Sequence, residues 1–168
     1  MLSGTNGITF GGAGTNSSGV AVPPELLAYG NGQIPRNLLA LLAGRGGHRL
    51  YSQAAAAFER FDAAARAAGI DLGITDSYRD YGQQVACAAA KGLTSNGGLC
   101  ATPGHSDHGW AMAVDLNVYK ANNLAWAHTN DELFGFCPNV RREPWHFTWV
   151  GVGNYCNTAW SPTGQATR

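Results

Sequence analysis

Two short segments of the chain concentrate side chains that can bind a metal ion or transfer a proton. Residues 104–116 (GHSDHGWAMAVDL) contain His108 and Asp115, and residues 143–147 (EPWHF) contain Glu143 and His146. Two histidines and one carboxylate form a common ligand set of catalytic zinc sites, which keep a fourth position for water. A nearby glutamate that does not bind the metal can act as a general base. The alternative is a hydrogen-bonded His146 in the core and a solvated His108.

Alternation of side chains predicts that the first segment runs into a strand. Over residues 111–119 (AMAVDLNVY), Met112, Val114 and Leu116 would lie on one face, and Asp115 would share the other face with two alanines. These small residues would leave open space above the carboxylate. Gly109 would let the chain turn so that His108 folds back over the same face.

The second segment is predicted to open the last strand, residues 145–151 (WHFTWVG). Its aromatic residues would lie on one face, with His146 and Thr148 on the other. Pro144 interrupts regular strand pairing, so Glu143 and His146 could converge.

The remaining pattern predicts an α+β fold with a mainly antiparallel sheet flanked by helices. Residues 52–69 indicate a helix with Ser52 as N-cap and Gly69 as its stop. We expect a strand at 70–78, a second helix at 80–92 that stops at Gly92, and a helix and turn at 121–136. Helices and strands do not alternate as they would in a parallel βαβ fold.

Composition excludes several classes of function. The 168 residues are 45% apolar and carry no net charge, which fits one domain and argues against a dedicated nucleic-acid-binding protein. No apolar run approaches the roughly 18 residues of a membrane-spanning helix, so we expect no membrane insertion. The first ten residues lack the pattern of a signal peptide.

The two ends of the chain differ in composition from the middle. Residues 1–20 are rich in glycine and small polar residues and are predicted to form a flexible arm, and residues 159–168 a tail or linker. The catalytic domain would then span 21–158. Of the four cysteines none forms a CxxC pair, so disulfides in any of three pairings, or buried thiols, remain open.

Three motifs resemble those of the LAS-type zinc peptidases, which include vancomycin-resistance-type D-alanyl-D-alanine carboxypeptidases and phage L-alanyl-D-glutamate endolysins. SDHGWAMAVD resembles their Ser-x-His-x-x-Gly-x-Ala-x-Asp motif, EPWHF their Glu-x-x-His, and SYRDYGQQ their Ser-x-Tyr-Arg region. The matches follow the same order and span residues 74–149. The resemblance implies a hedgehog/DD-peptidase-like fold.

The resemblance also implies a role for individual residues. His108, Asp115 and His146 would bind Zn²⁺, and Glu143 would be the catalytic base. Arg79 would bind a substrate carboxylate or support the polarised carbonyl. The residues expected to support the site or the substrate are Ser106, Gln84 and Tyr78. Ala111 stands where the family usually has glycine, which puts the local packing in question.

Other candidates are given lesser roles. His105 is expected in the wall of the site, and Asp107 in solvent. His48 and His128 are expected on the surface. The two tryptophans near the motifs, Trp110 and Trp145, are expected in the core.

The function implied is zinc-dependent hydrolysis of peptidoglycan stem peptides by a monomer acting at the cell wall, outside the cytoplasm. The bond would be D-Ala-D-Ala in a carboxypeptidase, or L-Ala-D-Glu in a phage or modular lysin. A zinc-containing cell-wall binding module without catalysis is the alternative. Disulfides Cys87–Cys100 and Cys137–Cys156 would tie the Arg79 element to the zinc loop and clasp the strand of His146.

Overall fold

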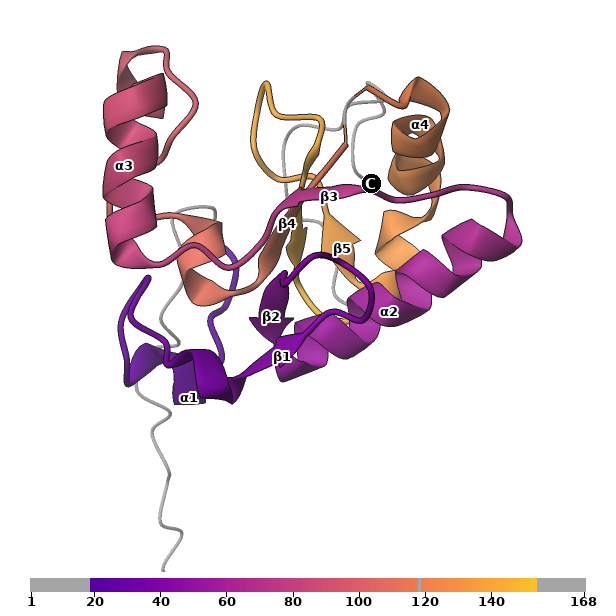
Figure 1. Cartoon of the computed structure of the whole chain (residues 1–168), viewed down its shortest axis with the longest axis horizontal. Helices are drawn as coiled ribbons and strands as arrows, with labels where there is room; N and C mark the ends of the chain where they lie inside the picture. Colours follow the sequence, from indigo (N-terminus) through magenta and orange to yellow (C-terminus); the bar gives the residue numbers. More distant parts are fainter. Residues whose placement is uncertain (1–18, 118, 154–168) are drawn as a thin grey trace, which may run out of the picture.

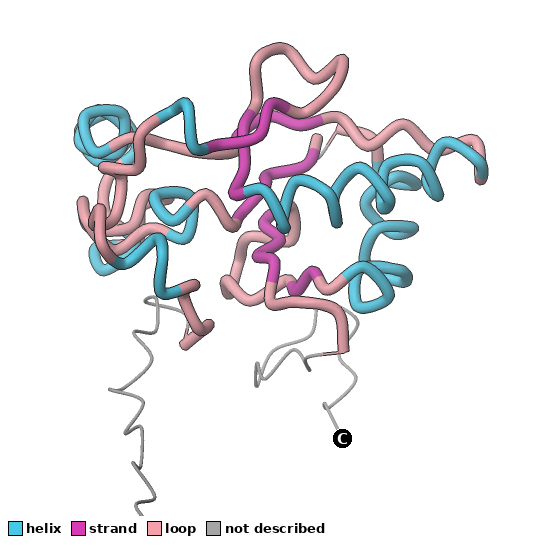
Figure 2. The backbone as a smooth tube through the Cα atoms, turned by 90° about the horizontal axis from the view of Figure 1, so that it is seen from below, coloured by secondary structure: helices cyan, strands magenta, loops and turns pink. Residues whose placement is uncertain are grey.

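A four-stranded antiparallel sheet, with strand order β3-β4-β6-β5, forms the centre of the computed structural model (Figure 1). A separate antiparallel hairpin pairs β1 with β2. Figure 2 shows the strands in the middle of the molecule with helices on either side. The strands are β1 (Leu39–Leu41), β2 (Arg49–Tyr51), β3 (Ile74–Asp76), β4 (Ala113–Leu116), β5 (Phe136–Cys137) and β6 (His146–Trp149). The predicted α+β class with an antiparallel sheet is confirmed.

The structure describes residues 19–117 and 119–153. Most of the predicted arm and all of the predicted tail therefore lie outside the described part of the chain. Among the described residues, no helix has the length and apolar character needed to cross a bilayer.

Helix α2 (Ser52–Ala67) supplies one wall of the hydrophobic core. Phe58 and Phe61 are almost completely buried and pack against Phe136 of β5, with ring centroids 6.1 and 5.7 Å from it. Fully burying a side chain of this size contributes about 1.5–3 kcal/mol. The predicted helix and its stop at Gly69 (φ +74°) are confirmed.

The predicted cap of α2 is wrong. Tyr51, the last residue of β2, occupies the N-cap position, and no side chain caps this end of the helix. The Tyr51 amide donates to the carbonyl of Ala111 at 2.8 Å, so the chain passes from the strand directly into the helix. No turn is left in which Ser52 could act as a cap.

Helix α3 (Tyr81–Lys91) begins with a capping box that the sequence analysis missed. The Asp80 side chain accepts from the Gln83 amide at 2.8 Å, and the Gln83 side chain accepts from the Asp80 amide at 2.9 Å. The helix ends at Gly92 (φ +73°), as predicted. This fixed start follows Arg79 by one residue and so sets where that side chain leaves the backbone.

The first predicted disulfide, Cys87–Cys100, is present and joins α3 to the chain that leads into the motif loop. Cys156 lies outside the described residues, so the second pairing stays a prediction.

The strand expected at 70–78 is shorter, since β3 covers only Ile74–Asp76. The remaining helical segments are α1 (Pro24–Leu27), η1 (Arg36–Leu38), η2 (Thr94–Asn96), η3 (Asp107–Trp110), α4 (Ala121–Asn130) and η4 (Asp131–Phe134).

The register of the sheet brings the polar residues together. Asp115 of β4 pairs with His146 of β6, and Val114 pairs with Phe147. Val114 and Phe147 are fully buried in the core, so the next pair along the strands faces the opposite side. On the other edge of β4, a register shift sets Asp76 of β3 opposite Asp115. Asp76, Asp115 and His146 thus form one row across three strands.

Candidate active site

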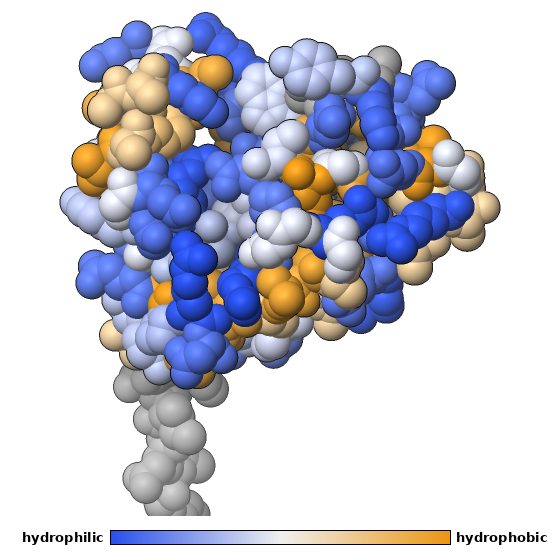
Figure 3. Space-filling model, in the orientation of Figure 1, coloured by the Kyte–Doolittle hydropathy of each residue, from blue (hydrophilic) through white to orange (hydrophobic). Residues whose placement is uncertain are grey.

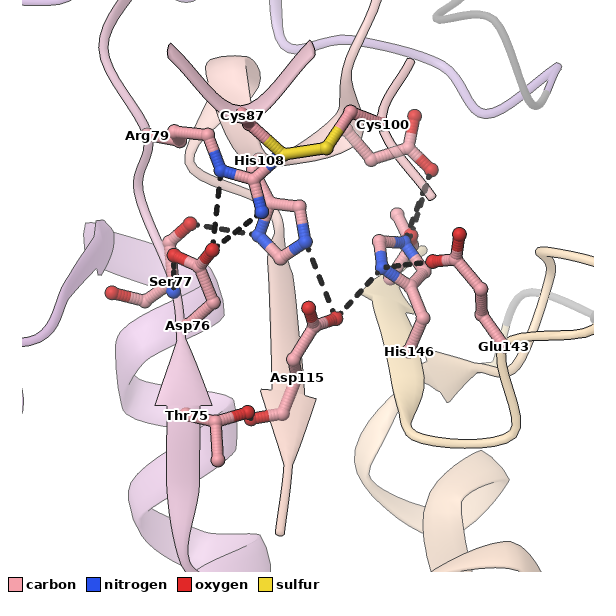
Figure 4. Close-up of polar contacts among 12 residues, drawn as sticks. Thr75, Asp76, Ser77, Arg79, Cys87, Cys100, His108, Asp115, Glu143 and His146 are labelled. Atoms are coloured by element: carbon pink, nitrogen blue, oxygen red, sulfur yellow. Dashed lines mark hydrogen bonds and ion pairs between the residues drawn. A yellow bond between two sulfur atoms is a disulfide. The ribbon is translucent and has the colours of Figure 1, made fainter. Parts of the chain in front are cut away.

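His108, Asp115 and His146 converge at the end of this row. His108 comes from η3, just before β4. Its Nε2 lies 3.2 Å from Asp115 Oδ1, and His146 Nδ1 lies 3.0 Å from the same oxygen. One potential ligand atom of each residue lies within 4.8 Å of the others. Figure 4 shows both imidazoles pointing at the carboxylate from either side. The predicted metal-binding residues therefore form a candidate metal site.

The outer nitrogen of each histidine is held by an oxygen. His108 Nδ1 lies 2.8 Å from the carbonyl oxygen of Ser77. Because a carbonyl can only accept, Nδ1 donates to it, and Nε2 is the nitrogen that faces Asp115. His146 Nε2 lies 3.1 Å from Thr148 Oγ1, whose hydroxyl donates to Asp107 Oδ2 at 2.9 Å. Nε2 therefore donates to Thr148, and Nδ1, which faces Asp115, is the nitrogen of His146 that a metal would bind, an arrangement that is typical of metal-binding histidines.

These outer partners correct two predictions. Asp107 is not solvated: it is 4% exposed, and it also accepts from the Asn139 side chain at 3.0 Å. His48 is half-buried, and its Nδ1 lies 2.9 Å from Ser77 Oγ. Contacts with residues that are distant in the sequence hold both side chains inside the structure.

Two further predictions are wrong. His128 is half-buried against Phe147, with ring centroids 4.8 Å apart, rather than on the surface. Trp145 lines the cleft described below rather than the core. It precedes β6 in the turn that contains Pro144, so the alternation of the strand does not extend to it. Trp110 packs against the core, as expected.

Electrostatics at the cluster favour positive charge. Burial alone would raise the pKa of Asp115, but His108 and His146 hold that pKa well below its ordinary value. Burial alone would lower the pKa of His146, but hydrogen bonds with Asp107 and Asp115 raise it to about 10. Carboxylates that stabilise a cationic imidazole this strongly will also stabilise a metal cation at the same place.

Glu143 faces the cluster from the turn before β6. Its Oε2 lies 3.9 Å from His146 Nδ1, and the residue is 9% exposed. Burial raises the pKa of Glu143, against the opposing effect of His146. A raised pKa brings a carboxylate closer to the range in which it both accepts and returns a proton near neutral pH. The position of Glu143 and its raised pKa are consistent with the predicted general base.

Arg79 is held rigidly beside the cluster. Asp76 accepts from its Nε and its Nη2, and Gln84 Oε1 accepts from Nη1 at 2.7 Å. Nη1 also lies 3.5 Å from Cys87 Sγ. The buried Gln84 in turn donates to the Ala101 carbonyl at 2.6 Å. Among the described residues these contacts leave one Nη2 proton of the guanidinium for a substrate.

A single cleft of about 800 Å³ contains the cluster, Glu143 and Arg79. Ser106 and the exposed His105 also line it, as expected. Tyr78 does not line it, because its hydroxyl donates to the Ile34 carbonyl at 2.9 Å and its ring packs against the core. Tyr78 therefore packs beneath the site and supports the fold there.

Residues 30–33, which carry no recognisable motif, brace the loop of His108. Asn31 is 7% exposed and donates from Nδ2 to the Ser106 carbonyl at 2.7 Å. The Gly32 amide donates to the Gly109 carbonyl at 2.8 Å, and the Gly32 carbonyl accepts from the Tyr81 amide at 2.9 Å. One short segment thus connects the motif loop to the start of α3.

Position 109 needs a glycine because Asn31 packs closely against it, and not because the chain turns there. Its φ is not positive, but a Cβ at this position would lie 2.1 Å from Asn31 Oδ1. Ala111 instead takes the left-handed conformation (φ +55°) that glycine adopts readily. Ala111, which stands where the family usually has glycine, therefore destabilises the fold by on the order of 1 kcal/mol through its backbone conformation. The expected effect was instead on the local packing, through the methyl group.

We expect Gly109→Ala to lower the free energy of unfolding by about 1–3 kcal/mol, because the new methyl overlaps Asn31. Combining it with Asn31→Ala removes the overlap, so the double variant should lose at least about 1 kcal/mol less than the sum of the single variants. Denaturant unfolding with the disulfide intact measures both. Gly82→Ala in α3, where a Cβ meets nothing closer than 3.5 Å, is the control. Additive losses would show that Asn31 and Gly109 are not coupled.

Comparison with known proteins agrees with this geometry. The family model described as VanY, D-alanyl-D-alanine carboxypeptidase, matches residues 47–152. A D-alanyl-D-alanine carboxypeptidase of Enterococcus faecalis is 32% identical over 120 residues. The match covers 55% of this chain and 44% of the relative, so this chain spans less than half of that protein's length.

Solved structures share the fold. The vancomycin resistance D,D-pentapeptidase VanY in complex with Zn(II) superposes with a TM-score of 0.58 at 25% identity, covering 71% of this chain and 83% of that one. VanYB in complex with D-Alanine-D-Alanine gives 0.58 and 25%, covering 68% and 77%. The LD-carboxypeptidase LdcB gives 0.58 at 22% identity, covering 71% of each chain, and supports the fold alone.

Proposed function

Because the chain belongs to the VanY family of D-alanyl-D-alanine carboxypeptidases, we propose that it is a zinc-dependent carboxypeptidase that removes the terminal D-alanine from peptidoglycan stem peptides. The observation that carries the proposal is the convergence of His108, Asp115 and His146 in one cleft, with Glu143 beside them. A substrate in the cell wall implies action there, outside the cytoplasm.

The three converging residues fit zinc. Two imidazole nitrogens and one carboxylate oxygen form the donor set of many catalytic zinc sites. Each imidazole is held through its outer nitrogen and turns its other nitrogen toward the shared carboxylate, and the surrounding carboxylates favour a cation. A related VanY was solved in complex with Zn(II), which supports the same metal here.

The residues around the cluster divide the chemistry among them. Zinc, when bound, supplies a Lewis acid that polarises the scissile carbonyl and lowers the pKa of a bound water toward about 7. Glu143 accepts a proton from the attacking water and then donates it to the amino group of the leaving D-alanine. The burial that raises the pKa of Glu143 favours both transfers.

In this proposal Arg79 does not bind a substrate carboxylate through two parallel hydrogen bonds. Asp76 and Gln84 already accept most of its N–H groups, so one proton and the positive charge remain for the substrate. A fixed charge of this kind stabilises negative charge that develops on the substrate without moving to meet it. Ser106 lines the same cleft and offers a hydroxyl to the substrate.

Cleavage of the L-Ala-D-Glu bond by a phage or modular lysin is the alternative activity that the motifs allow. The relatives named in the comparisons are carboxypeptidases, so we favour release of D-alanine. A binding module without catalysis is less consistent with a buried Glu143 and a rigidly held Arg79, since neither is needed to bind a metal.

We expect the zinc-loaded protein to release free D-alanine from a synthetic stem pentapeptide that ends in D-Ala-D-Ala. Enzymatic D-alanine assay and mass spectrometry of the shortened peptide measure the reaction, and metal-free protein is the control. New amino termini on D-glutamate in digested peptidoglycan would instead identify an endopeptidase. If zinc is bound and neither product forms, the protein is a binding module and not an enzyme.

A further inference from the structure

Two basic side chains at the open part of the cleft have no role in the chemistry described above. Lys91, the last residue of α3, and Arg141, in the loop between β5 and β6, both line the cleft and are exposed. Neither side chain has an ion-pair or hydrogen-bond partner within residues 19–117 and 119–153. Figure 1 places the end of α3 and the β5–β6 loop on the same side of the sheet. We call Lys91 and Arg141 the cationic rim.

Charge is divided between the two parts of the cleft. Its acidic lining residues are Asp107, Asp115 and Glu143, all of which lie in or beside the metal cluster. Asp107 and Glu143 are buried, and Asp115 is half-buried. No acidic residue lines the exposed part together with the cationic rim among the residues described. Figure 3 shows mainly hydrophilic surface between α3 and the rest of the molecule. The open part of the cleft therefore suits an anion.

The size of the cleft indicates what reaches this rim. A volume of about 800 Å³ lies toward the upper end of the range for pockets that enclose a drug-sized ligand. It exceeds what one terminal D-alanine would occupy. Several residues of the substrate can thus lie in the cleft, with the scissile bond at the cluster and the preceding residues extending toward the open part.

We propose that Lys91 and Arg141 form a subsite for a second free carboxylate, carried by the substrate on a residue that precedes the terminal D-Ala-D-Ala. This inference rests on the proposed carboxypeptidase function. A stem peptide offers such a group as the α-carboxylate of D-glutamate or, where the third residue is diaminopimelate, as the free carboxylate of that side chain. Both sources share one chemistry, and amidation or replacement by lysine removes it.

The subsite predicts a preference for acidic over amidated substrates. Exposed charge pairs contribute little individually, so two together should favour a carboxylate-bearing pentapeptide by about 5- to 20-fold in kcat/KM, mainly through KM. The preference should shrink with added salt, because exposed charges are screened.

The test compares four zinc-loaded proteins and one control variant on matched pentapeptides. The peptides carry D-glutamate or D-isoglutamine at the second position, and diaminopimelate or lysine at the third. The proteins are wild type, Lys91→Gln, Arg141→Gln and the double variant. Arg142→Gln is the control, because Arg142 is the neighbour of Arg141 but does not line the cleft.

In the double variant, acidic and amidated peptides should have kcat/KM values within about 2-fold of each other, while Arg142→Gln should keep the wild-type preference. The position at which loss of the carboxylate matters, by amidation at the second residue or by lysine at the third, identifies which carboxylate is bound. A wild type without preference, or a double variant that keeps it, would overturn the subsite. Calorimetric Kd values for the same peptides report on the rim even if no D-alanine is released, which separates failure of the subsite from failure of the proposed function.

Discussion

Replacing Glu143 with glutamine should lower kcat for D-alanine release by about 1,000- to 10,000-fold while the protein keeps one zinc per chain. Glutamine has the shape of glutamate but cannot accept a proton from the attacking water, and a positioned acid-base group contributes up to this much. Glu143 lies 3.9 Å from His146 Nδ1 but is not among the three residues whose ligand atoms converge. The metal should therefore remain.

Steady-state kinetics and elemental analysis on the same preparation measure both quantities. Glu132→Gln, an exposed carboxylate on η4, is the matched control and should behave like wild type. Loss of zinc together with activity would mean that Glu143 is a ligand. Activity within about 10-fold of wild type would mean that another group takes the proton.

Replacing His146 with alanine should weaken zinc affinity by more than 100-fold and abolish measurable turnover. Loss of an outer-shell partner alone costs roughly 10- to 100-fold in metal affinity, and removal of a ligand should cost more. The alanine also leaves Asp107 and Asp115 without the imidazole that they contact at 3.6 and 3.0 Å. The carboxylates of Asp107 and Asp115 would then repel each other inside the site.

Competition with a fluorescent zinc chelator measures the affinity, and circular dichroism verifies that the variant is folded. His105→Ala is the control, because His105 lines the cleft and immediately precedes the motif but does not belong to the converging set. It should keep zinc within a few-fold of wild type. If the two variants lose zinc equally, the assignment of His146 as a ligand is wrong.

Features that depend on neighbouring residues could be predicted from the sequence. Helix α2 follows from the spacing of Phe58, Phe61 and Ala65, and the ends of α2 and α3 from Gly69 and Gly92, because helix periodicity and left-handed caps are local properties. The motifs likewise identified the side chains that converge, because the chemistry of metal binding restricts which residue types serve as ligands. The Cys87–Cys100 disulfide was expected from the places of its two cysteines beside Arg79 and the motif loop, but four cysteines allow three pairings, and only the structure selects this one.

Errors arose where two distant segments meet. Asp107 was expected in solvent, but Thr148 and Asn139 make it part of the support of His146. Trp145 was assigned to the core because its alternation with Phe147 was extended through the turn at Pro144. These residues look ordinary in the linear sequence because their partners lie dozens of positions away.

The tertiary structure alone decided the register and the bracing of the site. A shift of β6 by one residue would turn His146 into the core and Phe147 toward Asp115, since successive side chains of a strand point to opposite faces. Burial of the Val114–Phe147 pair opposes this shift, because the shifted register would expose the apolar side chain of Phe147 to the cleft. Asn31 reaches the Ser106 carbonyl across 75 positions of chain, and only packing brings them together. The sequence thus determined which groups could do the chemistry, and long-range packing determined that they meet within hydrogen-bonding distance.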